Sequence, residues 1–185
     1  MARIVLVTGG CRSGKSRHAQ NMAENAGKKR LYIATAPVLD EEMAERVAKH
    51  REMRQGRGWE TCEESTDLAG SFHRAEGFDV ILCDCLTLWV NNLLYFASQE
   101  DRSLEEEEIV RQCAHVTEAA KANSAEVIFV TNEVGMGIVP AYKVSRQFRD
   151  LAGRCNQEVA SVAEQVILMV SGLPIFLKGL NHGNY

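Results

Sequence analysis

The sequence predicts an α/β fold: a mostly parallel β-sheet flanked by helices, with a short hairpin at its C-terminal end. Short runs of apolar residues alternate with longer helical stretches along the chain, which is the pattern of strands joined by crossover helices. Several of these runs are nearly continuous, as expected for strands buried on both faces. The first run leads directly into a glycine-rich segment and then a helical stretch, so the chain opens as strand, loop and helix.

The first half of the chain alternates strands and helices from its start. Gly27 ends the first helical stretch and Pro37 ends the second apolar run, because neither residue continues regular structure easily. Asp40 is a helix cap followed by two glutamates in the first turn, where the helix dipole favours acidic side chains. We therefore expect strands at residues 4–8, 30–35 and 59–62, and helices at residues 14–26 and 40–54.

The second half repeats the alternation and ends in two short strands. Glutamates at residues 105–108 mark the first turn of a long helix. Gly172 and Pro174 separate the last two apolar runs, as in a turn between hairpin strands. No linker or internal repeat interrupts the chain, so residues 1–185 are expected to form a single domain. The expected strands are residues 78–83, 126–131, 166–170 and 175–177, the expected helices are residues 86–96, 103–122 and 144–163, and residues 180–185 form a loose tail.

The glycine-rich segment at residues 9–16 reads GGCRSGKS and fits the phosphate-binding pattern G-x-x-x-x-G-K-[ST]. Backbone N–H groups of such a loop surround phosphate oxygens, and the start of the following helix adds partial positive charge. Lys15 reaches the terminal phosphates, and the Ser16 hydroxyl is suited to ligating Mg²⁺. The segment is therefore predicted to bind a nucleoside triphosphate through Gly9, Gly10, Cys11, Arg12, Ser13, Gly14, Lys15 and Ser16.

Asp84 follows the apolar run at residues 78–83. In a P-loop fold an acidic residue at this place holds Mg²⁺ directly or through water, and the alternative is a solvent-facing carboxylate after a core strand. Thr87, one turn later, is a candidate hydroxyl contact. A GTPase switch is disfavoured because the two D-x-x-G matches, at Asp67 and Asp150, lie in helical stretches, and the sequence has no N/T-K-x-D motif.

Composition excludes several other classes of protein. The net charge is −4 and the isoelectric point is about 5.8, which disfavours broad nucleic-acid binding. The longest apolar stretch, residues 166–177, is interrupted and too short to cross a bilayer, and the first strand leaves no room for a signal peptide. Six cysteines without a C-x-x-C pair favour reduced thiols in the cytoplasm, although the C-x-C at Cys83 and Cys85 leaves a metal site as an alternative.

Several stretches together resemble one known family. They are TGGCRSGKSR at residues 8–17, YIAT at 32–35, DEEMAER at 40–46 with His50 and Arg51, TNEVGMGIVP at 131–140 and FRDLAGRCN at 148–156. The chain resembles, from residue 3 to about 178, the bifunctional adenosylcobinamide kinases and adenosylcobinamide-phosphate guanylyltransferases of cobalamin biosynthesis. The resemblance implies a RecA-like P-loop fold, a homotrimer, and a corrinoid small molecule as the substrate.

The resemblance also implies two reactions. The aminopropanol hydroxyl of adenosylcobinamide is phosphorylated with ATP or GTP, and GMP from GTP is then transferred to that phosphate through a histidine–GMP intermediate. His50 matches the family's histidine, whereas His18, His73, His115 and His182 are interpreted as structural or surface residues. Beside Lys15 and the P-loop, the implied nucleotide contacts are Thr35, Ala36, Pro37, Arg51, Glu52, Met53, Arg54, Glu63 and Asp84.

Some assignments stay open at this stage. Glu60 or Glu64 could replace Glu63, and Asn132 with Glu133 could either stabilise a turn or contact the reacting groups or the corrinoid. One alternative function is a P-loop small-molecule kinase without guanylyl transfer, in which His50 is only a phosphate ligand. Another is a nucleotide-binding regulatory protein without chemistry of its own.

Overall fold

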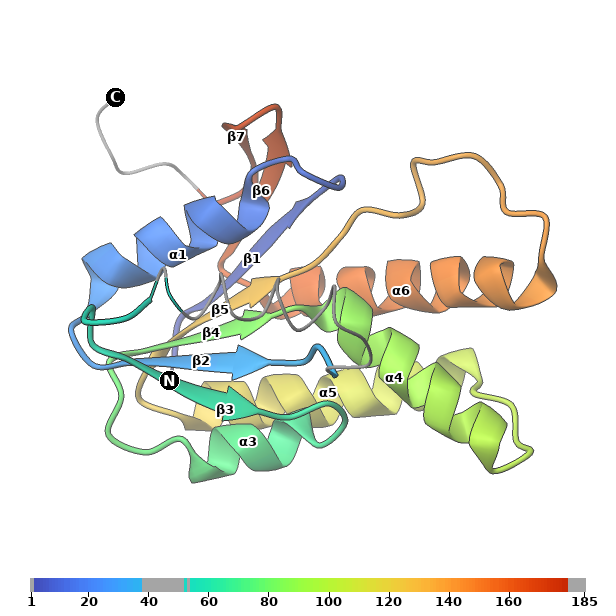
Figure 1. The fold of residues 1–185 in the computed structure, drawn as a ribbon, viewed down its shortest axis with the longest axis horizontal. Coiled ribbons are helices and arrows are strands. Elements are labelled where there is room, and N and C mark those ends of the chain that lie inside the picture. The colour runs from blue at the N-terminus through green and yellow to red at the C-terminus, as the bar shows by residue number, and fades with distance from the viewer. Residues whose placement is uncertain (1, 38–51, 53, 180–185) are drawn as a thin grey trace.

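A seven-stranded sheet in the order β3-β2-β4-β5-β1-β6-β7 organises the protein, and all neighbouring strands except the last pair are parallel. The computed structural model describes residues 2–37, 52 and 54–179 (Figure 1). The strands are β1 (Ile4–Gly9), β2 (Arg30–Ala34), β3 (Trp59–Glu63), β4 (Val80–Asp84), β5 (Glu126–Val130), β6 (Gln165–Val170) and β7 (Leu173–Lys178). The helices are α1 (Lys15–Ala26), α3 (Leu68–Arg74), α4 (Leu86–Gln99), α5 (Glu106–Ala122) and α6 (Lys143–Val162).

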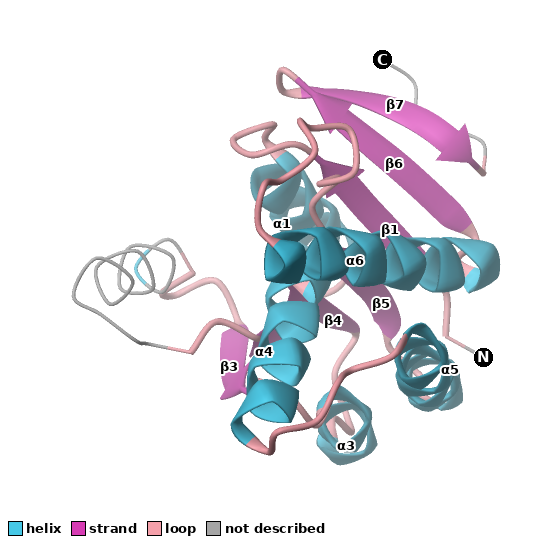
Figure 2. Cartoon of the chain, turned by 90° about the vertical axis from the view of Figure 1, so that its right-hand side faces the viewer, coloured by secondary structure: helices cyan, strands magenta, loops and turns pink. Residues whose placement is uncertain are grey.

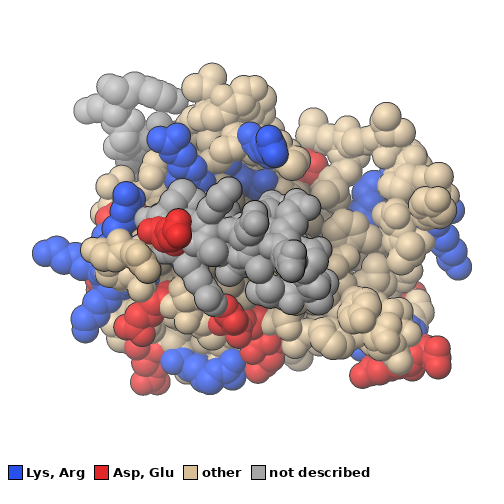
Figure 3. Space-filling model, in the orientation of Figure 1, with Lys and Arg blue, Asp and Glu red and all other residues tan. Residues whose placement is uncertain are grey.

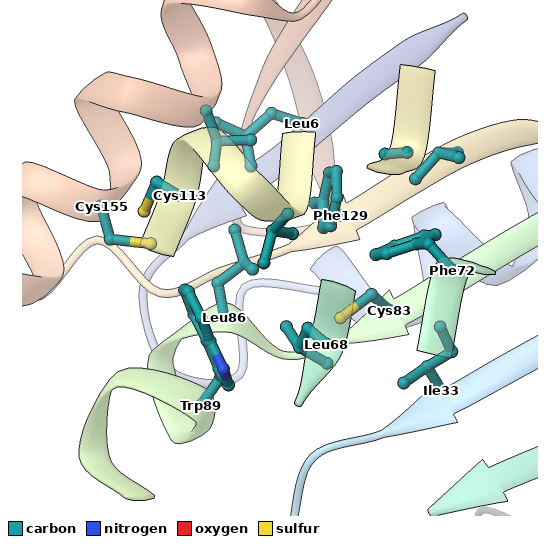
Figure 4. Close-up of a cluster of buried hydrophobic side chains, with 14 of the residues drawn as sticks. Leu6, Ile33, Leu68, Phe72, Cys83, Leu86, Trp89, Cys113, Phe129 and Cys155 are labelled. Carbon is teal, nitrogen blue, oxygen red and sulfur yellow. The ribbon is translucent and has the colours of Figure 1, made fainter. Parts of the chain in front are cut away.

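Helices cover both faces of the sheet, with α1 on one face and α3, α4, α5 and α6 on the other (Figures 1 and 2). Successive side chains of β1 point to opposite faces of the sheet and so contribute to both cores. Leu6 belongs to the core under α3–α6, whereas Val5 and Val7 belong to the core under α1. In the larger core, Phe72 of α3 and Phe129 of β5 meet edge to face with ring centroids 5.6 Å apart (Figure 4). The α/β fold with a C-terminal hairpin is therefore as the sequence predicts.

Several predicted boundaries differ from the structure. β7 begins at Leu173 instead of residue 175, so Pro174 lies in the strand and not in the turn. Two other differences have identifiable reasons. β4 begins at Val80 instead of residue 78, because the Asp79 carboxylate accepts hydrogen bonds from the N–H groups of Lys28 and Lys29 (2.8 and 2.9 Å) and closes the turn before β2. These bonds also lower the pKa of Asp79. The helix expected from residue 103 begins at Glu106, because Leu104 is buried in the core ahead of it.

The helical interpretation of the two D-x-x-G matches is confirmed. Both D-x-x-G matches lie at or in helices: Asp67 caps α3 by accepting from the N–H of Gly70 (2.9 Å), and Asp150 is in α6. All six cysteines are free thiols, and four of them are buried. Within the described residues no helix is long and apolar enough to cross a membrane. Most of the helix expected at residues 40–54 and the tail at 180–185 lie outside the described residues.

Candidate nucleotide-binding site

The glycine-rich segment forms a tight loop between β1 and α1. Gly9 (φ +154°) accepts no side chain, because a Cβ there would lie 2.6 Å from both the carbonyl oxygen of Met169 and the hydroxyl of Ser13. Gly14 (φ +92°) caps α1 without a side-chain hydrogen bond, so the first N–H groups of this helix are left for another acceptor. A loop of this shape at a helix N-terminus is an anion-binding site.

The polar side chains of the loop are arranged for phosphate. The Ser13 hydroxyl is buried and makes no hydrogen bond within the protein, and Lys15 donates from Nζ to the carbonyl oxygen of Gly10 (3.1 Å) across the loop. Arg12 and Arg17 are exposed beside it. In Figure 3, Lys and Arg side chains gather over the upper left of the molecule, where α1 and the turn into β2 lie.

The turn of the β6–β7 hairpin supports this loop from the C-terminal side. The N–H of Gly172 donates to the carbonyl oxygen of Ser13 (2.9 Å). A Cβ on Gly14 would stand 3.3 Å from the Cα of Gly172, so the two backbones approach closely. The shape of the loop therefore depends on residues more than 150 positions later in the chain.

Asp84 ends β4 at the carboxyl edge of the sheet and is half-buried. Its Oδ2 accepts a hydrogen bond from the hydroxyl of Tyr32 on β2 (3.2 Å). Burial, with the nearby negative charge of Asp84, raises the pKa of Tyr32 well above its usual value, so the phenol stays protonated as a donor. Asp84 is thus oriented by a neighbouring strand.

Arg54 packs against Tyr32, the residue that donates a hydrogen bond to Asp84. Its guanidinium lies over the ring of Tyr32, 3.6 Å from the centroid, and its side chain is buried. This contact connects a predicted nucleotide residue to the predicted metal ligand through a tyrosine that the sequence did not single out. The sequence carried one signal for this contact, a tyrosine in a mostly aliphatic strand. Tyr32 lies two positions before Ala34 and therefore on the same face of β2.

The charges of Lys15 and Asp84 both influence the pKa of the Cys85 thiol. Burial raises the pKa of the Cys85 thiol to about 12; the charge of Asp84 adds to this rise and that of Lys15 opposes it. β1 and β4 both run parallel to β5, so the P-loop and Asp84 follow strand ends at the same edge of the sheet. Ser16, in the first turn of α1, and Asp84 offer a hydroxyl and a carboxylate, the hard oxygen ligands that suit Mg²⁺.

Thr35 joins the ends of β2 and β4. Its hydroxyl donates to the carbonyl oxygen of Cys85 and accepts from the N–H of the same residue, both at 2.8 Å. Asn92 of α4 donates to the carbonyl oxygen of Thr35 (2.8 Å). The buried Thr35 thus fixes the backbone that leads to Ala36 and Pro37, which are half-buried beside it.

A buried network fixes the segment after β5. Thr131 donates to Oδ1 of Asn156 on α6 (2.7 Å), and the Thr87 hydroxyl accepts from the N–H of Asn132 (2.6 Å). Thr87 is therefore committed to this network. The N–H of Glu133 donates to the carbonyl oxygen of Gly9 (3.1 Å), which places Glu133 beside the P-loop.

Some of the remaining predicted residues are described by the structure, and others lie outside the described residues. Glu63 is exposed at the carboxyl end of β3, next to Ala34 in register, whereas Glu64 accepts from the N–H groups of Thr66 and Asp67 ahead of α3. Glu52 is exposed, and His73 and His115 are exposed on α3 and α5. His50, Arg51 and Met53 lie outside the described residues.

Fold and loop together define the chain as a P-loop nucleotide-binding protein with a RecA-like architecture. A solved structure of an ATP synthase subunit from Nanoarcheaum equitans is similar in fold, with a TM-score of 0.55 and 12% identity over 90% of this chain and 45% of that one. Two curated proteins named bifunctional adenosylcobalamin biosynthesis protein CobU are each 41% identical over 95% of this chain and 99% of their own length, one from Escherichia coli K12 and one from Salmonella typhimurium LT2.

Residues 5–177 match the family described as cobinamide kinase / cobinamide phosphate guanyltransferase. The chain belongs to this family. Because the match covers both the P-loop and the segment that follows β5, the whole carboxyl edge described above falls within it. The family resemblance found in the sequence is thereby confirmed.

Cys11 gives a direct chemical test of the P-loop assignment. It is the one cysteine classed as exposed, and it lies inside the loop. Treatment with a small maleimide should abolish triphosphate binding, because the adduct occupies the phosphate position, and bound GTP or ATP should protect the thiol. Binding of a fluorescent GTP analogue and intact-mass analysis measure both effects. Cys11→Ser should bind nucleotide and resist the reagent; full modification of Cys11 without loss of binding would contradict the assignment.

Proposed function

We propose that the chain catalyses two consecutive reactions on a corrinoid. It phosphorylates the aminopropanol hydroxyl of adenosylcobinamide with ATP or GTP, and it then transfers GMP from GTP to the new phosphate to give adenosylcobinamide-GDP. The observation that carries this proposal is the P-loop facing Asp84 and its Tyr32–Arg54 support, in a chain of the cobinamide kinase / cobinamide phosphate guanyltransferase family.

In the kinase reaction, the substrate hydroxyl attacks the γ-phosphorus and the nucleoside diphosphate leaves. Lys15 and the free N–H groups at the start of α1 stabilise the negative charge that develops on the transferred phosphoryl group. Ser16 and Asp84 would hold Mg²⁺, which would neutralise part of the negative charge of the triphosphate. Tyr32 keeps the Asp84 carboxylate oriented toward this position.

In the transferase reaction, we assign the nucleophile to His50. A neutral imidazole attacks the α-phosphorus of GTP, a P–N bond forms and pyrophosphate leaves. A phosphate oxygen of adenosylcobinamide phosphate then attacks the same phosphorus and releases the imidazole. Arg51, Glu52, Met53, Arg54 and Glu63, with Thr35, Ala36 and Pro37, complete the proposed nucleotide contacts.

The proposal is tested by substrate turnover. The purified chain, supplied with Mg²⁺, adenosylcobinamide and ATP, should form adenosylcobinamide phosphate, and addition of GTP should convert this product to adenosylcobinamide-GDP with release of pyrophosphate. Mass spectrometry identifies both corrinoid products. Phosphorylation without the second product would leave a kinase alone, and no corrinoid product with either nucleotide would overturn the proposal.

We further propose that the chain forms a single domain that assembles as a homotrimer in the cytoplasm. A three-fold ring needs two different surfaces that meet head to tail. The described chain exposes apolar side chains on several elements, and two of these sets lie on β7 and after β5. One set is on β7 and includes Leu173 (69% exposed) and Ile175 (48%). The other lies in the segment after β5 and includes Ile138 (96%) and Tyr142 (77%). In the ring, one neighbouring copy of the chain covers the first set and the other neighbouring copy covers the second.

The head-to-tail arrangement predicts a specific complementation. Leu173→Asp and Ile138→Asp should each give monomers, because each breaks one of the two surfaces at an exposed position. An equimolar mixture of the two variants should form dimers through the one pair of intact surfaces. Light scattering after size exclusion measures the masses, with Glu118→Lys on the exposed side of α5 as the control. Trimers in both single variants would contradict the proposed interface.

A further inference from the structure

A cavity of about 690 Å³ lies on the α6 side of the sheet, away from α1. Its walls come from β1, β6, β7 and α6, from the first residue of α5, and from the segment that follows β5. In Figure 2, α6 crosses in front of β1 and β6, and the chain after β5 continues beyond the sheet toward the start of α6. The volume is within the range of pockets that bind small molecules, which is roughly 300–1,000 Å³.

This cavity reaches the P-loop from the face opposite α1. Thr8, in its wall, directly precedes Gly9, and Glu133, also in its wall, donates its N–H to the carbonyl oxygen of Gly9 (3.1 Å). Glu133 and Gly135 follow the carboxyl end of β5, so the cavity extends to the edge of the sheet where the phosphates would lie. A molecule held here could place a hydroxyl group over that edge.

The cavity wall carries charges of both signs in nearly equal number, with Glu106, Glu133 and Asp150 against Arg149 and Arg154. Arg149 pairs with Asp150 (3.2 Å), and Arg154 pairs with Glu158 (2.8 Å) and Glu106 (3.5 Å). Neither sign is in large excess, so the wall does not select a polyanion or a cation. Apolar side chains and the amides of Asn156 and Gln157 make up much of the rest of the wall. Such a lining suits a neutral ligand that carries both hydrogen-bond donors and acceptors on an apolar frame.

Thr8 supplies an independent sign of a ligand. Thr8 is only 6% exposed, and its hydroxyl oxygen is buried without a hydrogen-bond partner. The neighbouring Thr131, on the same face of the sheet, donates to Asn156 instead. Buried polar groups are nearly always satisfied, so a hydroxyl left over in a cavity wall indicates where a polar group of a ligand binds.

We propose that this cavity binds the amide side arms of the corrinoid acceptor. Primary amides offer a donor and an acceptor on the same group, which matches a neutral, mixed wall, and the cavity is sized for part of a corrinoid. Held there, the corrinoid would direct its aminopropanol arm over the edge toward the P-loop. This inference rests on the proposed function, because it takes the corrinoid as the substrate, and it adds the place where that substrate binds.

Gly153 of α6 allows the cavity to be filled by one substitution. It lines the cavity, and a Cβ added there would meet no atom within 4 Å. Gly153→Phe should raise the dissociation constant for adenosylcobinamide at least about tenfold, because the ring occupies the space of the side arms. Gly153→Ala is the matched control, since it makes the same change in the helix backbone while leaving the cavity open, and it should bind the corrinoid as the wild type does. Equilibrium dialysis measures binding through the visible absorbance of the corrinoid.

A second pair of variants tests the hydroxyl of Thr8. Thr8→Val should weaken corrinoid binding about five- to tenfold, and Thr8→Ser, which keeps the hydroxyl, should restore it. In all four variants a fluorescent GTP analogue should bind within about twofold of the wild-type affinity, which shows that the P-loop is intact. If Gly153→Phe does not fold, the Thr8 pair decides the question.

The outcomes separate this inference from the proposed function. If the wild type phosphorylates adenosylcobinamide and Gly153→Phe and Thr8→Val bind it with unchanged affinity, the cavity assignment is overturned and the function stands. If Gly153→Phe changes only the mass of the assembly, the cavity is a contact between copies of the chain and the assignment is likewise overturned. If the wild type neither binds nor phosphorylates the corrinoid, the proposed function fails first.

Discussion

Lys15→Ala should lower kcat/KM by about 10³-fold or more in the kinase reaction and abolish guanylyl transfer as well. The ammonium of Lys15 lies across the loop from the start of α1 and is the P-loop cation placed to stabilise charge on the phosphates. Loss of one preorganised donor to a developing oxyanion costs about 10²–10³-fold, and the variant also loses a charge that holds the bound triphosphate. Steady-state kinetics with each nucleotide and direct GTP binding measure both losses.

The matched control for this variant is Lys28→Ala. Lys28 is exposed just beyond the other end of α1, and its structural hydrogen bond to Asp79 comes from its backbone N–H, which the substitution keeps. The control removes the same charge and should behave as the wild type. Retained activity in Lys15→Ala would contradict the assignment of the P-loop as the site of both reactions.

His50→Ala should eliminate guanylyl transfer and leave most of the kinase activity. Removal of a covalent nucleophile is among the most damaging single changes to an enzyme, with losses that reach about 10⁶-fold, whereas the kinase reaction needs no covalent adduct. Incubation with Mg²⁺ and α-³²P-GTP should label the wild-type chain with a bond that is acid-labile and base-stable, as a phosphoramidate is. The variant should carry no label and should still form adenosylcobinamide phosphate.

The exposed histidines of α3 and α5 provide the controls. His73→Ala and His115→Ala should be labelled as fully as the wild type. Equal loss of both activities in His50→Ala would instead mean that this histidine shapes a nucleotide site common to the two reactions. Label that persists in His50→Ala would assign the covalent intermediate to another residue.

The features that the sequence predicted well are those encoded over short distances. The P-loop follows from the spacing of glycines and Lys15, and the strands follow from apolar runs buried on both faces. The place of Asp84 could be predicted because the carboxyl end of a parallel strand has a known place at the sheet edge.

The features that could not be predicted from the sequence depend on contacts between distant segments. Tyr32 orients Asp84 across 52 positions of sequence, and no local pattern indicates that a strand tyrosine will meet a particular carboxylate. The hydroxyl of Thr35 is engaged with the backbone of Cys85, 50 positions away, and no local pattern indicates this contact. The unpartnered hydroxyl of Thr8 could be recognised only once its surroundings were known.

The bracing of the P-loop by the β6–β7 turn has a consequence for biosynthesis. β1, which leads into residues 9–16, lies between β5 and β6, and the Ser13 carbonyl receives its hydrogen bond from Gly172. These partners come much later in the chain, and contacts between segments far apart in sequence are slow to form. During synthesis the loop therefore cannot take its final shape before β5, β6 and the turn at Gly172 have emerged.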